Sequence, residues 1–276
     1  MKNILETSTD NKQFCFNQQF KYHYELTETM SKNSFYNHCH SDYEFFLFLN
    51  GSAEYNIEGQ IYDMKPYTLL IIRPTEYHYL QPLTLDNYKR LVINFSSSIL
   101  PESIILKLNT MKKHYCFSKN DEIINCFFKL INVFESYTKE DFEIILKTKL
   151  IEILYNLIYM KYINTSLTDS ENNIPEIIKN ILEYVNKNIT IHIDLDSISQ
   201  DLFFSKSYLS HIFKDHMKIS LMQYIKQKKV FFAQSLLSQG FKPTKVYEMC
   251  GFKDYITFYR VYVSILKHKP SDKINK

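Results

Sequence analysis

The first third of the chain alternates short apolar runs with turn-forming residues. Between about residues 14 and 95, β-rich runs follow one another at roughly 8–12-residue spacing, which is typical of a small β-barrel or sandwich. These runs are Tyr43–Leu49, Glu54–Glu58, Gln60–Met64, Thr68–Ile72 and Lys89–Phe95. Asn50-Gly51 between two of them predicts a β-hairpin, and Glu58-Gly59 and Pro66-Tyr67 predict further turns.

The pattern becomes helical after about residue 120. One apolar stripe runs through Ile124, Phe127, Phe128, Ile131 and Phe134, and another through Leu146, Leu150, Ile153, Leu154, Leu157 and Ile158. The second predicted helix is apolar almost all round, so we expect its own domain to cover one side and a second subunit the other. Residues 164–173 are polar and rich in Ser and Asn, which indicates a linker. Every periodic segment after it is helical.

Charge divides the chain at the same place. The net charge is +3, but residues 1–173 hold 17 bases and 21 acids, whereas residues 174–276 hold 16 bases and 9 acids. An acidic front and a basic back indicate two domains with different partners. The 45% apolar content argues against disorder, and five scattered cysteines argue against a disulfide scaffold. Charged residues interrupt both the N-terminus and the most apolar segment, so we expect a soluble, cytoplasmic protein without membrane contact.

The basic half contains an internal repeat. Each copy has a short helix with apolar residues four apart, a tight turn, and a second helix that opens on Ser205 or Asp254 as N-cap. A long helix joins the copies, starting with the capping box Ser220 to Gln223 and stopping at Gly240. Two helix-turn-helix units on one connector can place two recognition helices in successive major grooves. The alternative is an ordinary helical bundle with a coincidental repeat.

The outward faces of the two second helices carry the candidate DNA contacts. Lys206, Ser207, Ser210, His211 and Lys214 lie on the first, and Lys253, Tyr255, Ile256, Tyr259 and Arg260 on the second. Basic residues at the edges suit phosphates, and small polar residues at the centre suit base edges.

Residues 195–271 resemble the DNA-binding domain of AraC/XylS-family transcription regulators. The resemblance is carried by Ser205, Tyr208, Leu209, Ser210, Phe213, Lys214, Tyr224, Lys229, Ala233, Leu236, Leu237, Gly251, Phe252, Phe258, Arg260, Tyr262, Lys269, Pro270 and Ser271. It implies base contacts from Ser207, Ser210, His211, Tyr255, Ile256, Thr257 and Arg260. The sequence departs from the family where Lys218 and Lys267 replace glycines, Lys229 replaces an arginine, Val263 replaces a lysine and Tyr247 replaces a small residue.

A histidine cluster marks the front half. His38, His40 and Glu44, followed by Gly51, resemble the first cupin motif, and His78 is a candidate fourth ligand. Three imidazoles and one carboxylate would suit Zn, Mn, Ni or Fe. Three interpretations stay open: a bound divalent metal, polar contacts with an effector, or structural remnants of cupin ancestry. The cysteines are interpreted as buried or small apolar thiols.

The chain is therefore predicted to be α+β, with a cupin-like β-barrel, a helical dimerisation segment and an all-α double helix-turn-helix domain. The expected boundaries are 1–115, 116–165, a linker at 166–173, and 174–276. The predicted function is sequence-specific DNA binding in transcription regulation, without enzymatic activity, controlled by a small-molecule effector in the barrel. Double-stranded DNA, a second copy of the chain and, for an activator, RNA polymerase are the expected partners. The alternatives are a metal-dependent cupin enzyme with a helical appendage, and a helical protein–protein adaptor.

Overall fold

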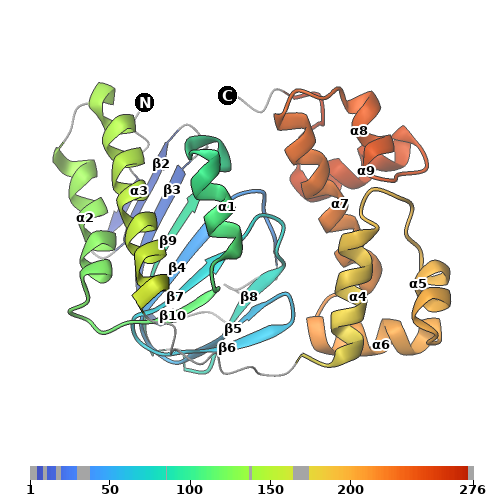
Figure 1. The fold of residues 1–276 in the computed structure, drawn as a ribbon, viewed down its shortest axis with the longest axis horizontal. Helices are drawn as coiled ribbons and strands as arrows, with labels where there is room; N and C mark the ends of the chain where they lie inside the picture. Colours follow the sequence, from blue (N-terminus) through green and yellow to red (C-terminus); the bar gives the residue numbers. More distant parts are fainter. Residues whose placement is uncertain are drawn as a thin grey trace.

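The computed structural model describes residues 5–8, 11–16, 20–29, 38–84, 86–136, 139–163 and 174–272. A β-rich unit comes first along the chain and a helical unit second, and the two lie side by side (Figure 1). The predicted linker lies outside the described residues, so the predicted domain boundaries stay predictions. Among the described helices, none is long and apolar enough to cross a membrane.

The described strands form two antiparallel sheets. The larger sheet has the order β1-β2-β3-β9-β4-β7-β10, and the smaller one has the order β6-β5-β8. The strands are β1 (Leu5–Ser8), β2 (Asn11–Phe16), β3 (Phe20–Thr29), β4 (Tyr43–Asn50), β5 (Ala53–Ile57), β6 (Gln60–Met64), β7 (Thr68–Ile72), β8 (His78–Pro82), β9 (Asp86–Phe95) and β10 (His114–Cys116). The strand spacing predicts a small β-barrel or sandwich, and the N-terminal β domain of two sheets confirms this fold class.

Alternation along the central strands separates two cores. Odd-numbered residues such as Phe45 and Ile71 face the helices, whereas even-numbered residues such as Phe46 and Leu70 face the smaller sheet. Because both faces are covered, β4 is buried along almost its whole length and β7 along all of it. Continuous apolar runs are what such doubly covered strands require.

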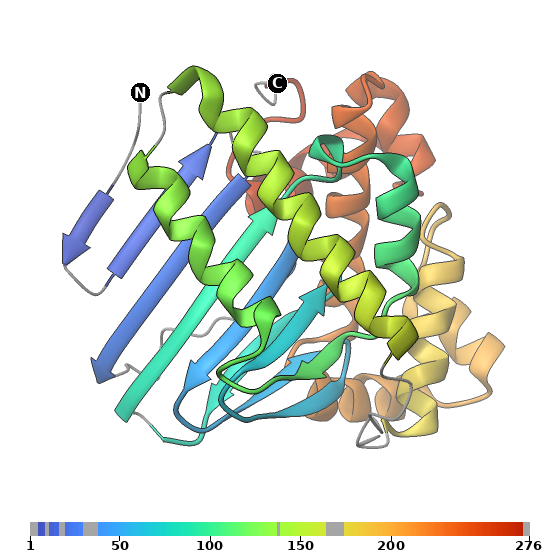
Figure 2. The ribbon, with the colours of Figure 1, turned by 60° about the vertical axis from the view of Figure 1, so that its left-hand side comes forward.

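Three helices cover the outer face of the larger sheet. They are α1 (Glu102–Thr110), α2 (Glu122–Ser136) and α3 (Lys139–Ile163), and Figure 2 shows α2 and α3 lying across the strands. Phe127 of α2 packs edge-on against Phe45, at 5.9 Å between ring centroids. The inward side of α3 is buried at Leu146, Leu150 and Leu154, while Ile144, Tyr155 and Tyr159 are exposed.

The turn prediction at Asn50-Gly51 is only half right. The chain does turn there, with Gly51 at φ +110°, but β4 and β5 do not pair as a hairpin. Strand β4 is already hydrogen-bonded to β7 and β9 on its two edges, so β5 crosses to the smaller sheet. Glu58-Gly59 forms the true two-residue hairpin, because Ile57 pairs with Gln60 and both turn residues have positive φ.

The helical unit contains α4 (Glu176–Lys187), α5 (Leu195–Leu202), α6 (Lys206–Met217), α7 (Leu221–Ser238), α8 (Pro243–Met249) and α9 (Tyr255–Leu266). One apolar core joins α4, α5, α6 and the start of α7, and another joins the rest of α7 with α8 and α9. Helix α7 therefore belongs to both halves. This is the connector helix that the repeat predicts.

Candidate functional site

Each half of the helical unit presents a helix-turn-helix. Helices α5 and α6 are joined through Phe203 at φ +59°, and α8 and α9 through Gly251 at φ +63°. The predicted N-caps are confirmed, since the Ser205 side chain accepts the Tyr208 N–H and the Asp254 side chain accepts the Thr257 N–H. The Ser220 hydroxyl likewise accepts the Gln223 N–H at the start of α7. Local capping thus fixes where each second helix begins.

The predicted DNA contacts lie on the outward faces of α6 and α9 or on the turn before α9. Ser210, Tyr255 and Tyr259 are half-buried. The other side chains are exposed, namely Lys206, Ser207, His211, Lys214, Lys253, Ile256, Thr257 and Arg260. The inward faces are closed by Leu209, Phe213, Phe258 and Tyr262, which are fully buried. Apolar cores under two polar, partly basic faces are what paired recognition helices require.

Several of these side chains already have partners within the helical unit. Lys206 forms an ion pair with Asp196, and His211 Nδ1 lies 3.1 Å from Asp215 Oδ2. Both pairs are exposed, and exposed ion pairs contribute little to stability. The Thr257 hydroxyl donates to Asp254 at 2.9 Å as part of the N-cap.

Lys229 and Gly251 tie the two halves together. The Lys229 ammonium, on α7, donates to the carbonyls of Ile191, Cys250 and Gly251. A Cβ at Gly251 would lie 2.1 Å from the Ile191 carbonyl carbon, so only glycine fits. Burial lowers the pKa of Lys229 to about 8. The family resemblance singled out Lys229 and Gly251, but Ile191 carried no signal in the sequence.

The histidine cluster predicted in the front half also assembles. His40 Nε2 lies 3.1 Å from Glu44 Oε2, and His78 Nε2 lies 4.0 Å from the same oxygen. The His38 ring centroid is 4.4 Å from that of His78. His38, His40 and His78 can offer one nitrogen each within 4.8 Å of one another. Strand β4 supplies Glu44 and β8 supplies His78, while His38 and His40 come from the segment before β4.

Burial and hydrogen bonding set the charges in this cluster. Burial alone would raise the pKa of Glu44, but hydrogen bonds from His40 and Asn94 and the nearby imidazoles hold it well below its usual value. Burial lowers the pKa of His78 to about 3, so its imidazole is neutral. Burial opposes protonation of His40 too, but its hydrogen bond to Glu44 raises its pKa overall. Asn94 and Tyr55, which both donate to Glu44, were not predicted because only the folded sheets bring them there.

The cysteine interpretation holds for three of the four cysteines whose side chains are described. Cys39, Cys126 and Cys250 are buried, and burial raises the pKa of Cys39 and of Cys250 to about 12. Cys116 is exposed at the edge strand β10, so the expectation of a buried thiol is wrong there. Successive side chains of a strand point to opposite faces, so Cys116 is exposed although its neighbour Tyr115 is buried.

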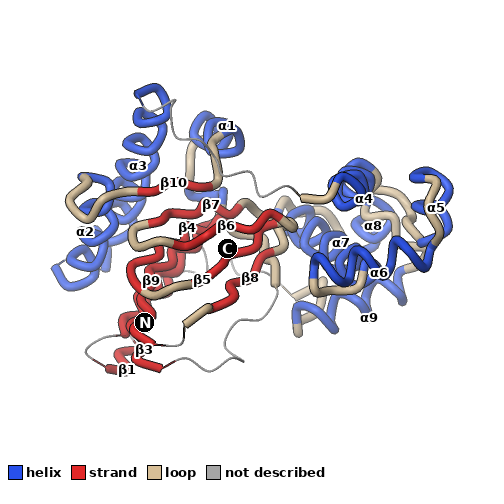
Figure 3. The backbone as a smooth tube through the Cα atoms, turned by 90° about the horizontal axis from the view of Figure 1, so that it is seen from below, coloured by secondary structure: helices blue, strands red, loops and turns tan. Residues whose placement is uncertain are grey.

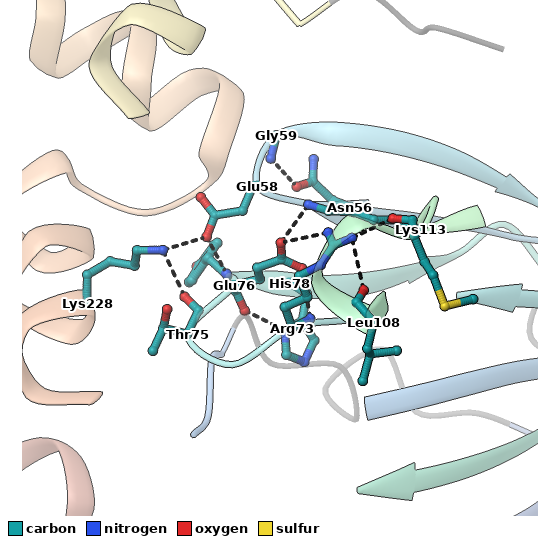
Figure 4. A network of polar contacts seen from close by, with 12 residues as sticks. Asn56, Glu58, Gly59, Arg73, Thr75, Glu76, His78, Leu108, Lys113 and Lys228 are labelled. Carbon is teal, nitrogen blue, oxygen red and sulfur yellow. Dashed lines mark hydrogen bonds and ion pairs between the residues drawn. The ribbon is translucent and has the colours of Figure 1, made fainter. Parts of the chain in front are cut away.

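A further contact, absent from the sequence analysis, joins the front unit to α7. Glu58 of the β5–β6 turn accepts from Tyr224 at 2.5 Å. It also accepts from Lys228 Nζ at 3.2 Å (Figure 4). Lys228 also donates to the Thr75 carbonyl at 3.1 Å, and His216 Nε2 lies 2.9 Å from the Gly59 carbonyl. In Figure 3 the smaller sheet lies next to α6 and α7, as these bonds require. The partners are about 160 residues apart, so no local pattern indicates them.

The loop between β7 and β8 is held from both sides. Its Arg73 guanidinium donates to the Met111 carbonyl at 2.5 Å, next to the end of α1, and Glu76 pairs with Lys113 at 2.7 Å. On the other side Tyr77 is buried in the first core of the helical unit, with its ring 5.9 Å from that of Tyr224. The loop therefore contacts the end of α1 on one side and α7 on the other.

Comparison with known proteins agrees with both halves. Residues 22–154 match the model of the AraC-like ligand binding domain, and residues 198–275 match a helix-turn-helix domain model. The transcriptional regulatory protein HptR of Staphylococcus aureus is 23% identical over 95 residues, which cover 34% of this chain and 38% of HptR. An uncharacterized response regulatory protein of Staphylococcus epidermidis is 29% identical over 97 residues. These residues cover 35% of this chain and 37% of that protein. The chain thus spans less than two fifths of the length of these relatives.

Solved structures give a weaker likeness. A ToxT structure from Vibrio cholerae, with bound unsaturated fatty acid, matches with a TM-score of 0.41 and 13% identity over 93% of this chain and 95% of ToxT. The C-terminal domain of AraT, a response regulator from Geobacillus stearothermophilus, has a TM-score of 0.35 and 21% identity over 36% of this chain and 84% of that domain. The assignment rests on the two domain models: this chain belongs to the AraC/XylS family of transcription regulators.

Proposed function

We propose that this chain is a sequence-specific DNA-binding transcription regulator whose recognition helices are α6 and α9. The observation that carries this proposal is the pair of capped helices with exposed polar faces, each on its own apolar core and both tied to α7. Lys206, Lys214 and Lys253 supply phosphate-binding charge, while Ser207, Ser210, His211, Tyr255, Ile256, Thr257 and Arg260 face the bases and Tyr259 flanks them. Such a protein acts in the cytoplasm and needs no enzymatic activity.

A selection experiment with the full chain tests this function. Genomic fragments retained by the purified protein are sequenced, and the affinity for an enriched fragment is compared with that for an unrelated one. We expect a clear preference for the enriched fragment, and Arg260→Ala costs about 1–3 kcal/mol of binding free energy. The matched control is Lys129→Ala, which removes an exposed charge from the front unit. No enrichment, or equal losses in both variants, contradicts the proposal.

Control by an effector in the front domain is the second part of the proposal. The match to the AraC-like ligand binding domain supports it, and the cluster of His38, His40, Glu44 and His78 lies close to the contact with α7. A ligand changes the affinity for DNA only if it binds the DNA-binding conformation of the chain and the other conformation with different affinity. The alternative of a metal-dependent enzyme would require turnover as well as bound metal. RNA polymerase is a further partner if the protein activates transcription.

Dimerisation through α3 is the third part. Ile144, Tyr155 and Tyr159 are 70%, 50% and 66% exposed on the side of α3 away from the sheet. Large apolar side chains gathered on one helix face are typical of a protein interface. We expect a homodimer in analytical ultracentrifugation and a monomer for Tyr155→Asp with Tyr159→Asp. A monomeric wild-type chain at micromolar concentration contradicts this part of the proposal alone.

A further inference from the structure

His211 and Asp215 form a pair on the outward face of α6. They are one helical turn apart, so their side chains lie next to each other, and His211 Nδ1 is 3.1 Å from Asp215 Oδ2. Both side chains remain largely exposed, at 79% and 65%. An exposed pair of this kind adds little to the stability of the fold, so its effect on what α6 binds is the more informative question.

Asp215 fixes which nitrogen of the His211 ring carries the proton. An ionised carboxylate can only accept hydrogen bonds, so the ring nitrogen that faces it, Nδ1, must be the donor. In a neutral imidazole the other nitrogen, Nε2, is then an acceptor. The opposite tautomer would place the lone pair of Nδ1 against the carboxylate. His211 therefore offers an acceptor, and not a donor, to a molecule bound on α6.

An acceptor on α6 can bond to only one kind of group in the major groove. Each base pair presents one amino donor there, which is N6 of adenine or N4 of cytosine. The other groups are acceptors, namely the purine N7, O6 of guanine and O4 of thymine. Neutral His211 can bond only to the amino group, whereas lysine and arginine, which only donate, bond to the acceptors. The position of the amino group in the groove differs among the base pairs, so this contact discriminates between them.

The negative charge of Asp215 lies on the face that meets DNA in the proposed function. It is the only acidic residue of α6, which also carries Lys206 and Lys214. A carboxylate there repels the phosphates and lowers the affinity for every duplex, whatever its sequence. A residue that weakens binding to all DNA, yet holds a base-contacting side chain in one state, trades affinity for discrimination.

We propose that His211 Nε2 accepts a hydrogen bond from the exocyclic amino group of an adenine or a cytosine in the major groove, and that Asp215 is the positioning residue that makes it an acceptor. The inference rests on the proposed DNA binding and names one base contact of that interface. Ser207, His211 and Asp215 follow one another at four-residue spacing, so they form one line along the exposed face of α6.

Binding of the full chain to short duplexes tests the contact at pH 8, where free imidazole is neutral. Fragments are first selected with the wild-type chain, and the base pair whose preference disappears in His211→Ala is the one that His211 contacts. There the amino group is removed from the major groove by 2-aminopurine in place of adenine, or by 2-pyrimidinone in place of cytosine. In separate duplexes a 7-deazapurine removes the N7 acceptor.

We expect the wild-type chain to lose about fivefold in affinity without the amino group and to tolerate the loss of N7. His211→Ala should respond to neither replacement, and this comparison cancels any effect on the duplex itself. His211→Arg should respond to the loss of N7 instead. A wild-type chain that responds to N7 but not to the amino group overturns the assignment of Nε2 as an acceptor. If no base pair changes its preference in His211→Ala, the contact itself is overturned.

The positioning role is tested with variants of Asp215. Asp215→Ala allows either tautomer of the ring, so most of the response to the amino group should be lost, while the affinity for an unrelated duplex rises. Asp215→Asn keeps an accepting oxygen and should keep most of the response. The matched control, Asp201→Ala, removes an equal charge from an exposed position on α5 and should leave the response unchanged.

Two further outcomes separate the inference from the function on which it rests. An unchanged response in Asp215→Ala overturns the positioning role, although the DNA binding stands. A wild-type chain that retains no fragment at all overturns the proposed DNA binding, and the inference with it. Both side chains are exposed, so we expect their variants to fold as the wild type does.

Discussion

Gly251 shows how one backbone position can fix the arrangement of two helices. It combines a φ of +63° with an approach that leaves no room for Cβ against the Ile191 carbonyl. Gly251→Ala should lower the free energy of unfolding by at least about 2 kcal/mol, from left-handed strain and backbone displacement together. Urea unfolding measures the loss. Gly240→Ala is the matched control, since Gly240 has φ +94° but nothing within 4 Å of its Cβ; equal losses in the two variants contradict the steric argument.

Lys267 is the opposite case, because a residue with a side chain occupies a backbone position that favours glycine. It is the C-cap of α9 and adopts φ +63°, a conformation unfavourable for a residue with Cβ. Lys267→Gly should raise the free energy of unfolding by about 1 kcal/mol. Thermal unfolding of this variant beside Lys267→Ala checks it, because alanine keeps the strain. A lower free energy of unfolding for Lys267→Gly would contradict this, because it would show that contacts of the lysine side chain stabilise the fold by more than the left-handed backbone conformation destabilises it.

At the same scale, local chemistry predicted Ser205, Ser220 and Asp254 as caps, and the structure confirms all three. Capping depends on neighbours within three residues, so the sequence contains the whole interaction. The close approach of Ile191 to Gly251 depends on two helix pairs meeting, and no local pattern records it.

Among the elements, α7 is the one on which both helix-turn-helix units depend. Its Lys229 satisfies carbonyls from the α4–α5 loop and from the turn before α9. Lys229→Met keeps the aliphatic stem but leaves these acceptors unpaired, so we expect a loss of about 2–4 kcal/mol, measured by urea unfolding. Lys229→Arg should lose less. A loss below about 0.5 kcal/mol for Lys229→Met would show that water replaces the ammonium.

The same lysine predicts a pH dependence. Its pKa is lowered from 10.5 to about 8 by burial, so between these values the native chain binds fewer protons than the unfolded chain. Stability contributed by this group therefore rises as pH increases across that window. The stability difference between wild type and Lys229→Met should widen from pH 8 to pH 10. A stability difference that narrows between pH 8 and pH 10 would contradict the predicted direction of the pH dependence.

The elements themselves were predictable where their period was regular and their partners were close in sequence. The strands at 60–64 and 68–72 have their predicted bounds, and the connector helix predicted between Ser220 and Gly240 is α7 with Ser220 as its N-cap. Strand β8 and helix α1 were missed. Asn50-Gly51 was taken as a hairpin because a turn signal is local, whereas pairing depends on which sheet edge is vacant.

For the whole molecule, the contact through Glu58 is the feature that relates the front unit to the DNA-binding helices. Lys228 is 7% exposed, and Glu58 supplies its counter-charge. A double-mutant cycle of Glu58→Gln and Lys228→Met should give a coupling free energy of about 1–3 kcal/mol. Unfolding by urea supplies the four stabilities. Additivity within about 0.3 kcal/mol would mean that the ion pair contributes nothing to the docked arrangement.

The division of the chain into an acidic front half and a basic helical half was visible in the sequence, and so was the resemblance to the family. The histidine cluster was predicted by residue number because its motif is compact. The docking of the two units was not, because Glu58, Tyr224 and Lys228 are ordinary surface residue types until the fold joins them.

The salt dependence of DNA binding by the full chain tests the central claim most directly. Affinity for a selected fragment is measured by fluorescence anisotropy over a range of salt concentrations. The logarithm of the affinity should fall linearly with that of the salt concentration, and Lys206→Ala and Lys214→Ala should each reduce the slope by about 1. Arg260→Ala should also weaken binding. Binding that is absent at moderate salt, or the same in all these variants, contradicts the assignment of α6 and α9 as the DNA interface.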